Sequence, residues 1–113
     1  MTAIIIDDEV SSINTIEKIL KEFCPAVDII GSTSSPYDGI KLIREKNPDI
    51  VFLDIEMPMM NGFELLDALP TKSFDLVFIT AYDHYAIKAF KFNAIDYILK
   101  PVNIKDLIQV VNK

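Results

Sequence analysis

The chain has little of what marks secreted, membrane-spanning or nucleic-acid-binding proteins. Its single cysteine, Cys24, cannot form an internal disulfide bond, which fits a reducing cytoplasm. No apolar run approaches the roughly 20 residues of a membrane-spanning helix, and no secretory signal begins the sequence. The formal net charge is −6, so phosphate backbones would be repelled. We therefore expect a cytoplasmic domain with no membrane contact, suited to divalent cations or basic partner surfaces.

Half of the 113 residues are apolar, which is enough for one domain with one packed core. Short apolar runs alternate with segments whose apolar residues recur at helical spacing, such as Ile13, Ile16 and Leu20. The expected strands are residues 3–6, 27–30, 50–53, 76–79 and 97–99. The second run is the most mixed in polarity, which favours a strand at the edge of the sheet. Five strands alternating with five helices predict a parallel sheet between helical layers, an α/β fold.

Three of the expected helices carry recognisable start signals. Ser35 precedes Pro36, a typical N-cap followed by proline at the first helical position. Asn61 and Glu64 have the spacing of a capping box, and Asn103 is placed to cap the last helix.

The chain is organised around the run from Asp49 to Pro58, and within it around Asp54. Residues 50–53 are all apolar, which is typical of a strand buried on both faces of a parallel sheet. Asp54 stands at the C-terminal end of this strand, and Pro58 prevents further strand pairing. Functional sites of open α/β sheets lie outside the carboxyl ends of the strands. We therefore predict that Asp54 is the reactive residue.

Other strands also end in polar side chains. Asp7 and Asp8 follow the first strand, Thr80 ends the fourth, and Lys100 follows the fifth. Because the carboxyl ends of parallel strands meet at one edge, these residues should converge with Asp54 on one pocket.

The chemistry of such a pocket favours phosphoryl transfer. Neighbouring carboxylates repel one another, and a divalent cation relieves the repulsion; oxygen ligands suit Mg²⁺. The Lys100 ammonium and the Thr80 hydroxyl could stabilise the oxygens of a phosphoryl group. Asp54 could then act as a nucleophile and form an aspartyl phosphate.

Together, Asp7-Asp8, Asp54, Thr80-Ala81 and Lys100-Pro101 resemble the signature of two-component response-regulator receiver domains. The resemblance covers essentially the whole chain. It implies a flavodoxin-like, doubly wound sheet of five parallel strands in the order 2-1-3-4-5, flanked by five helices.

The resemblance also implies roles for individual residues. Asp54 matches the phosphoacceptor. Asp8 and Asp54 match direct Mg²⁺ ligands, Asp7 one that acts largely through water, and Glu56 the position whose main-chain carbonyl completes the metal site.

Thr80 and Lys100 match the hydroxyl and amine that sense the phosphoryl group. Tyr97 matches the switch aromatic that turns inward as Thr80 moves, and the bond between Lys100 and Pro101 matches one that is usually cis.

The stretch from Thr80 to Phe90 and the following Asn93–Pro101 are similar to receivers joined to LytTR-type DNA-binding domains. We expect residues 1–113 to be a receiver domain excised from a longer protein, since the last helix is cut off after about two turns. The implied partners are a sensor histidine kinase and a second copy bound through the fourth helix, fifth strand and fifth helix. DNA would be contacted only by an output domain outside this chain.

Two other functions were weighed. Asp54-Ile55-Glu56 superficially resembles the Asp-x-Asp of aspartate-nucleophile, Mg²⁺-dependent phosphatases, but the second acid is glutamate and there is no room for a substrate cap. A flavodoxin-like cofactor binder would need a Ser/Thr/Gly-rich loop where Asp7-Asp8-Glu9 stands. We therefore expect a switch that assists its own phosphorylation and hydrolysis, not an enzyme with a separate substrate.

Overall fold

The computed structural model describes residues 1–113, in which five strands and five helices alternate. In chain order they are β1 (Thr2–Ile6), α1 (Val10–Phe23), β2 (Asp28–Thr33), α2 (Pro36–Lys46), β3 (Ile50–Leu53), α3 (Gly62–Asp67), β4 (Asp75–Thr80), α4 (Ala86–Lys91), β5 (Asp96–Leu99) and α5 (Ile104–Val111). All strands are parallel and form one sheet in the order β2-β1-β3-β4-β5. The predicted fold class and strand order are confirmed. None of the helices combines the length and apolar content that a membrane span requires.

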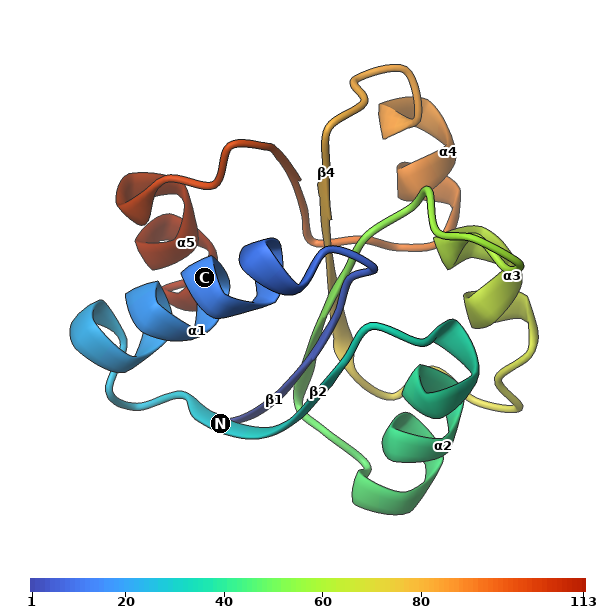
Figure 1. Ribbon diagram of the computed structural model, residues 1–113, viewed down its shortest axis with the longest axis horizontal. Coiled ribbons are helices and arrows are strands. Elements are labelled where there is room, and N and C mark those ends of the chain that lie inside the picture. Colours follow the sequence, from blue (N-terminus) through green and yellow to red (C-terminus); the bar gives the residue numbers. More distant parts are fainter.

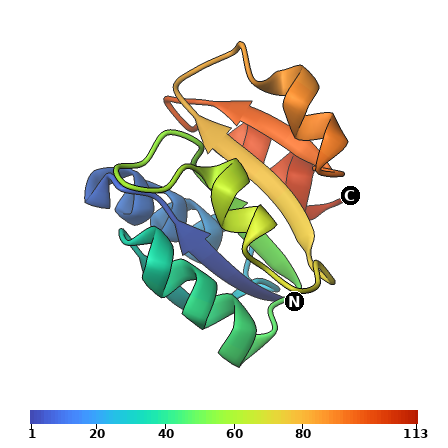
Figure 2. The same cartoon turned by 90° about the vertical axis from the view of Figure 1, so that its right-hand side faces the viewer.

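The helices form two layers around the sheet. Figure 1 shows α1 and α5 on one side and α2, α3 and α4 on the other, and Figure 2 looks onto the layer of α2, α3 and α4, with α1 and α5 behind the sheet. Successive strand residues point to opposite faces, so β1 contributes Ala3 and Ile5 to the core under α1 and α5, and Ile4 and Ile6 to the core under the other layer. β1 from Ala3 onward and the whole of β3 are therefore apolar, and the first polar residue after each stands at the C-terminal end of its strand.

The helix starts follow from local hydrogen bonds. The Asp38 amide donates to the Ser35 side chain at 3.3 Å at the start of α2. Asn61 and Glu64 form a complete capping box, with both hydrogen bonds at 2.9 Å. Asn103 caps α5, with its side-chain oxygen accepting from the Asp106 amide. These three start signals were read correctly from the sequence.

The second strand differs from its predicted bounds. It begins one residue later than expected and continues through Gly31, Ser32 and Thr33, which pair with Ile4, Ile5 and Ile6. An edge strand needs only backbone pairing on one side, so residues with no apolar side chain can extend it. Its predicted position at the edge of the sheet is confirmed.

Candidate functional site

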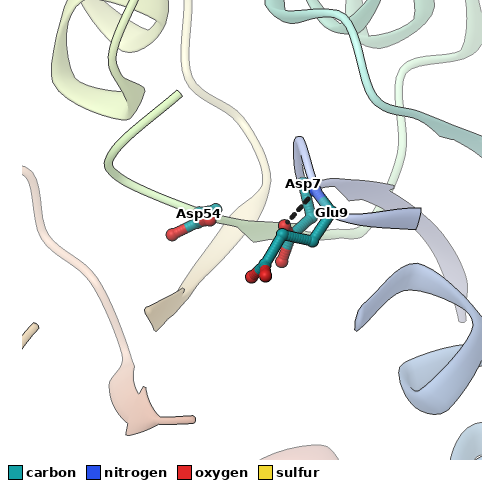
Figure 3. A group of neighbouring side chains, drawn as sticks. All are labelled: Asp7, Glu9 and Asp54. Carbon is teal, nitrogen blue, oxygen red and sulfur yellow. Dashed lines mark hydrogen bonds between the residues drawn. The ribbon is translucent and has the colours of Figure 1, made fainter. Parts of the chain in front are cut away.

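The carboxyl ends of the central strands bring Asp7 and Asp54 together. Asp7 follows β1 and Asp54 follows β3, and the Asp54 amide donates to the Ile6 carbonyl at 3.0 Å. Both side chains are buried, with residue exposures of 1% and 5%. Figure 3 shows them with Glu9, which lies in the turn after β1. One carboxylate oxygen from each of the three residues lies within 4.8 Å of the others.

The ammonium of Lys100 joins these three carboxylates. Its Nζ donates to Glu9 Oε1 at 2.6 Å, to Asp7 Oδ1 at 3.2 Å and to Asp54 Oδ2 at 3.2 Å. An ammonium has three donor hydrogens, so all of them are used. The peptide bond between Lys100 and Pro101 is cis, and the Lys100 amide donates to the Thr80 carbonyl at 2.8 Å. Lys100, directly after β5, thus lies at the same end of the sheet as Asp7 after β1 and Asp54 after β3.

Burial makes the two innermost carboxylates reluctant to ionise. Desolvation raises the pKa of Asp7, and desolvation together with the charge of Asp7 raises the pKa of Asp54, despite the opposing effect of Lys100. The exposed Glu9 behaves oppositely, because its hydrogen bond with Lys100 lowers its pKa. Hydrogen bonds and charges of the carboxylates raise the pKa of Lys100 in spite of its burial, so its side chain stays protonated. The site therefore carries more negative charge than one lysine offsets.

The donor set fits a hard divalent cation. Oδ2 of the buried Asp7 has no hydrogen-bond partner, although Lys100 Nζ lies 3.0 Å away at an angle that makes no hydrogen bond. The half-buried Asp8 has its pKa raised by desolvation and by the charge of Asp54, and it is not one of the three acids whose carboxylate oxygens lie within 4.8 Å of one another. An open carboxylate oxygen among other carboxylates is the environment that Mg²⁺ prefers.

The sequence reasoning missed Glu9. In the sequence Glu9 is only the third of three consecutive acids, yet in the structure it makes the shortest contact with Lys100. Its side chain is 56% exposed, so burial does not distinguish it from other surface acids. The run of three consecutive acids is the one feature of the sequence that points to it.

The remaining predicted site residues lie around this edge without touching Asp54 through hydrogen bonds. Thr80 is fully buried, and its hydroxyl accepts from the Tyr82 amide at 3.4 Å. The half-buried Tyr97 donates its hydroxyl to the Tyr82 carbonyl. The exposed Glu56 accepts through its side chain from the Tyr85 hydroxyl at 3.2 Å. The only histidine, His84, is exposed and stacks near Tyr85, 4.2 Å between ring centroids.

The electrostatics predict how stability depends on pH. A raised pKa means that the folded domain keeps protons that the unfolded chain has lost. The contribution of Asp54 to the free energy of unfolding is therefore fully present below its ordinary pKa of 3.8 and is lost as pH rises through the folded value.

In EDTA, we expect Asp54→Asn to gain stability relative to the unmodified domain as pH rises from 4 toward 7, measured by urea unfolding. Mg²⁺ at ten times its Kd should restore about 1.4 kcal/mol to the unmodified domain.

Asp28→Asn is the matched control, since Asp28 is an exposed aspartate at the start of β2. It should show no such pH-dependent gain. A free energy of unfolding of Asp54→Asn that falls relative to that of the unmodified domain as pH rises would contradict the raised pKa.

Comparisons with known proteins agree with this geometry. The profile of the family described as the response regulator receiver domain matches residues 3–112. An uncharacterized response regulatory protein of Vibrio cholerae is 41% identical over 114 residues, covering 100% of this chain and 48% of that protein. The transcriptional regulatory protein BtsR of Escherichia coli is 40% identical over 101 residues, covering 88% of this chain and 42% of BtsR. The sensory transduction protein LytT of Bacillus cereus is 37% identical over 115 residues, covering 100% and 46%.

The chain spans about half the length of the curated relatives it matches. Among solved structures, the response regulatory domain of protein mrkE from Klebsiella pneumoniae superimposes with a TM-score of 0.89 at 30% identity, over 99% of this chain and 93% of that one.

Proposed function

Because the chain belongs to the response regulator receiver domain family of two-component signalling, we propose that Asp54 accepts a phosphoryl group from a sensor histidine kinase. The observation that carries the proposal is the Lys100 ammonium held between Asp7 and Asp54 at the carboxyl edge of the sheet. This places a nucleophilic carboxylate, two further acids and a fixed positive charge within a few ångströms. A phosphoryl group arriving there meets both its acceptor and its counter-charge.

Mg²⁺ would be held by Asp8 and Asp54 directly, by Asp7 through water and by the Glu56 main-chain carbonyl; when bound, it would neutralise charge on the phosphoryl oxygens. The Asp54 carboxylate forms the new oxygen–phosphorus bond as the bond from phosphorus to the histidine nitrogen breaks, and the imidazole leaves with the bonding electrons. Lys100 then donates to a phosphoryl oxygen, and the Thr80 hydroxyl donates to another, since it only accepts from the Tyr82 amide and its own proton is not used in that bond. These hydrogen bonds form only when Asp54 is phosphorylated. They would therefore stabilise one conformation of the switch relative to the other.

The proposed switch comprises the β4–α4 loop, α4 and Tyr97. The Tyr97 hydroxyl donates to the Tyr82 carbonyl in this loop, and the Tyr82 amide donates to the Thr80 hydroxyl. A movement of Thr80 would therefore displace both the loop and Tyr97. Large apolar side chains are exposed on the neighbouring surface: Ile87 and Phe90 on α4, Leu99 on β5 and Ile104 on α5. We propose this surface for dimerisation or for contact with an output domain.

The name of BtsR supports transcription regulation as the output, and that of LytT supports a role in sensory transduction. We propose that the output acts through a LytTR-type DNA-binding domain C-terminal to residues 1–113 in the full protein. The proposed role is that of a switch, in which the only turnover is the loss of the phosphoryl group from Asp54.

The test is intact-mass spectrometry after incubation with acetyl phosphate. The unmodified domain should gain one phosphoryl group in Mg²⁺ and none in EDTA, and Asp54→Asn should gain none. Full phosphorylation of Asp54→Asn would contradict the assignment. Multiple turnover on small phosphate esters would instead favour a phosphatase.

A further inference from the structure

The positive charge at the site is shared between two buried acids and one exposed acid. Lys100 Nζ lies 3.2 Å from Asp7 Oδ1 and from Asp54 Oδ2, but only 2.6 Å from Glu9 Oε1. The side chains of Asp7 and Asp54 are 2% and 6% exposed, whereas that of Glu9 is 56% exposed. Glu9 thus holds the ammonium from the solvent side, outside the pair of acids that would face a metal ion.

The ammonium and a divalent cation compete for the same carboxylates. Oδ2 of Asp7 is buried without a hydrogen bond and lies beside Lys100, so a cation entering there meets the ammonium first. Two positive charges that share the same acids repel each other, and Mg²⁺ coordination would weaken the bonds of Lys100 to Asp7 and Asp54. Glu9 is the partner that the ammonium keeps, because its contact with Nζ is the shortest of the three and its side chain is the exposed one.

We propose that Glu9 is a positioning residue that holds Lys100 aside when Mg²⁺ enters the site, and so sets the affinity for Mg²⁺. This deepens the proposed function and rests on it. With Glu9 present, the displaced ammonium retains a strong hydrogen bond to an anion. Without Glu9, displacing the ammonium leaves it with no fixed partner, so metal binding becomes less favourable. Glu9 acts through Lys100 and is not itself assigned as a metal ligand.

The experiment is isothermal titration of the metal-free domain with MgCl₂. Glu9→Gln should weaken Mg²⁺ binding by about tenfold, the scale of losing a residue that orients a metal site. Glu9→Asp keeps the charge but shortens the side chain by one methylene, so the contact at 2.6 Å is lost and a similar weakening is expected. Glu22→Gln is the matched control, since it removes one exposed charge at the far end of α1 and should leave the Kd unchanged.

The dependence on Lys100 is tested in a Lys100→Met background. There Mg²⁺ should bind more tightly than in the unmodified domain, and adding Glu9→Gln should change the Kd by less than about twofold once the ammonium is gone. If Lys100→Met does not fold without metal, the Glu9→Asp comparison decides alone. Unmodified affinity in Glu9→Asp, or an equal loss for Glu9→Gln in both backgrounds, would overturn the proposal. Failure of the unmodified domain to bind Mg²⁺ would instead contradict the proposed function.

Discussion

Replacing Lys100 with methionine is expected to lower the rate of phosphorylation by acetyl phosphate about 100-fold or more, measured at saturating Mg²⁺. With Mg²⁺ bound, Glu9 would keep the ammonium at the rim of the site, near enough to Asp54 to donate to a phosphoryl oxygen with little rearrangement as charge shifts during transfer. Removing one such preorganised donor from an enzyme active site costs about 10² to 10³ in rate. The loss should occur even though Mg²⁺ binds more tightly, which separates the role of Lys100 in transfer from its competition with the metal.

The same variant should be less stable without metal. Asp7 and Asp54 would be left as buried charges with no cation, and breaking a buried ion pair costs about 3 kcal/mol or more. Circular dichroism in EDTA and in Mg²⁺ should therefore show a larger metal-dependent gain in Tm than for the unmodified domain. Lys105→Met removes an exposed lysine of α5 as the control and should change neither property. A phosphorylation rate for Lys100→Met within about threefold of the unmodified rate would refute this role.

Replacing Gly62 with alanine is expected to cost both stability and phosphorylation. Gly62 begins α3 and packs directly against the loop that carries Asp54. A Cβ there would lie 2.5 Å from the Asp54 main-chain oxygen and 3.2 Å from Ile55 Cα. Both neighbours are backbone, so they cannot rotate away, and the Gly62 amide is also bonded to the Ile55 carbonyl at 2.8 Å. The Asp54 peptide must shift.

Overpacking of this kind costs about 1–3 kcal/mol, and a displacement of about 1 Å at reacting groups can cost about 100-fold in rate. Urea unfolding and acetyl phosphate kinetics measure the two effects. Gly31→Ala is the control, because its Cβ would meet only the flexible end of Leu42 at 3.3 Å. Equal stability and rate for Gly62→Ala and Gly31→Ala would show that the α3 contact does not position Asp54.

The sequence predicts the fold and the inner part of the site for one physical reason. Residues 50–53 form the all-apolar run that is typical of a strand buried on both faces, and in a parallel sheet the C-terminal ends of the strands lie together. Asp7, Asp54 and Lys100 directly follow strands, so topology alone brings them together. The capping residues were equally predictable, because an N-cap depends on contacts three residues apart.

The rest depends on contacts that no local pattern encodes. The position of Glu9 follows from the path of the turn after β1 and from the reach of Lys100, which is 91 residues away in the chain. The buried Thr80 hydroxyl bonds to the Tyr82 amide because of the path of the β4–α4 loop. The bond from Tyr85 to Glu56 joins two loops that only the tertiary fold brings close. The C-terminal extension of β2 likewise depends on the backbone of β1 and not on its own apolar content.

We propose that Asp54 receives the phosphoryl group at a site completed by Asp7, Lys100 and Mg²⁺. Borohydride reduction after acetyl phosphate treatment is the most direct measurement, because it converts an acyl phosphate of aspartate to homoserine, which tandem mass spectrometry locates in the sequence. We expect homoserine at position 54 alone, in Mg²⁺ and not in EDTA. Homoserine at another aspartate, or none under conditions where the domain binds Mg²⁺, would contradict the account.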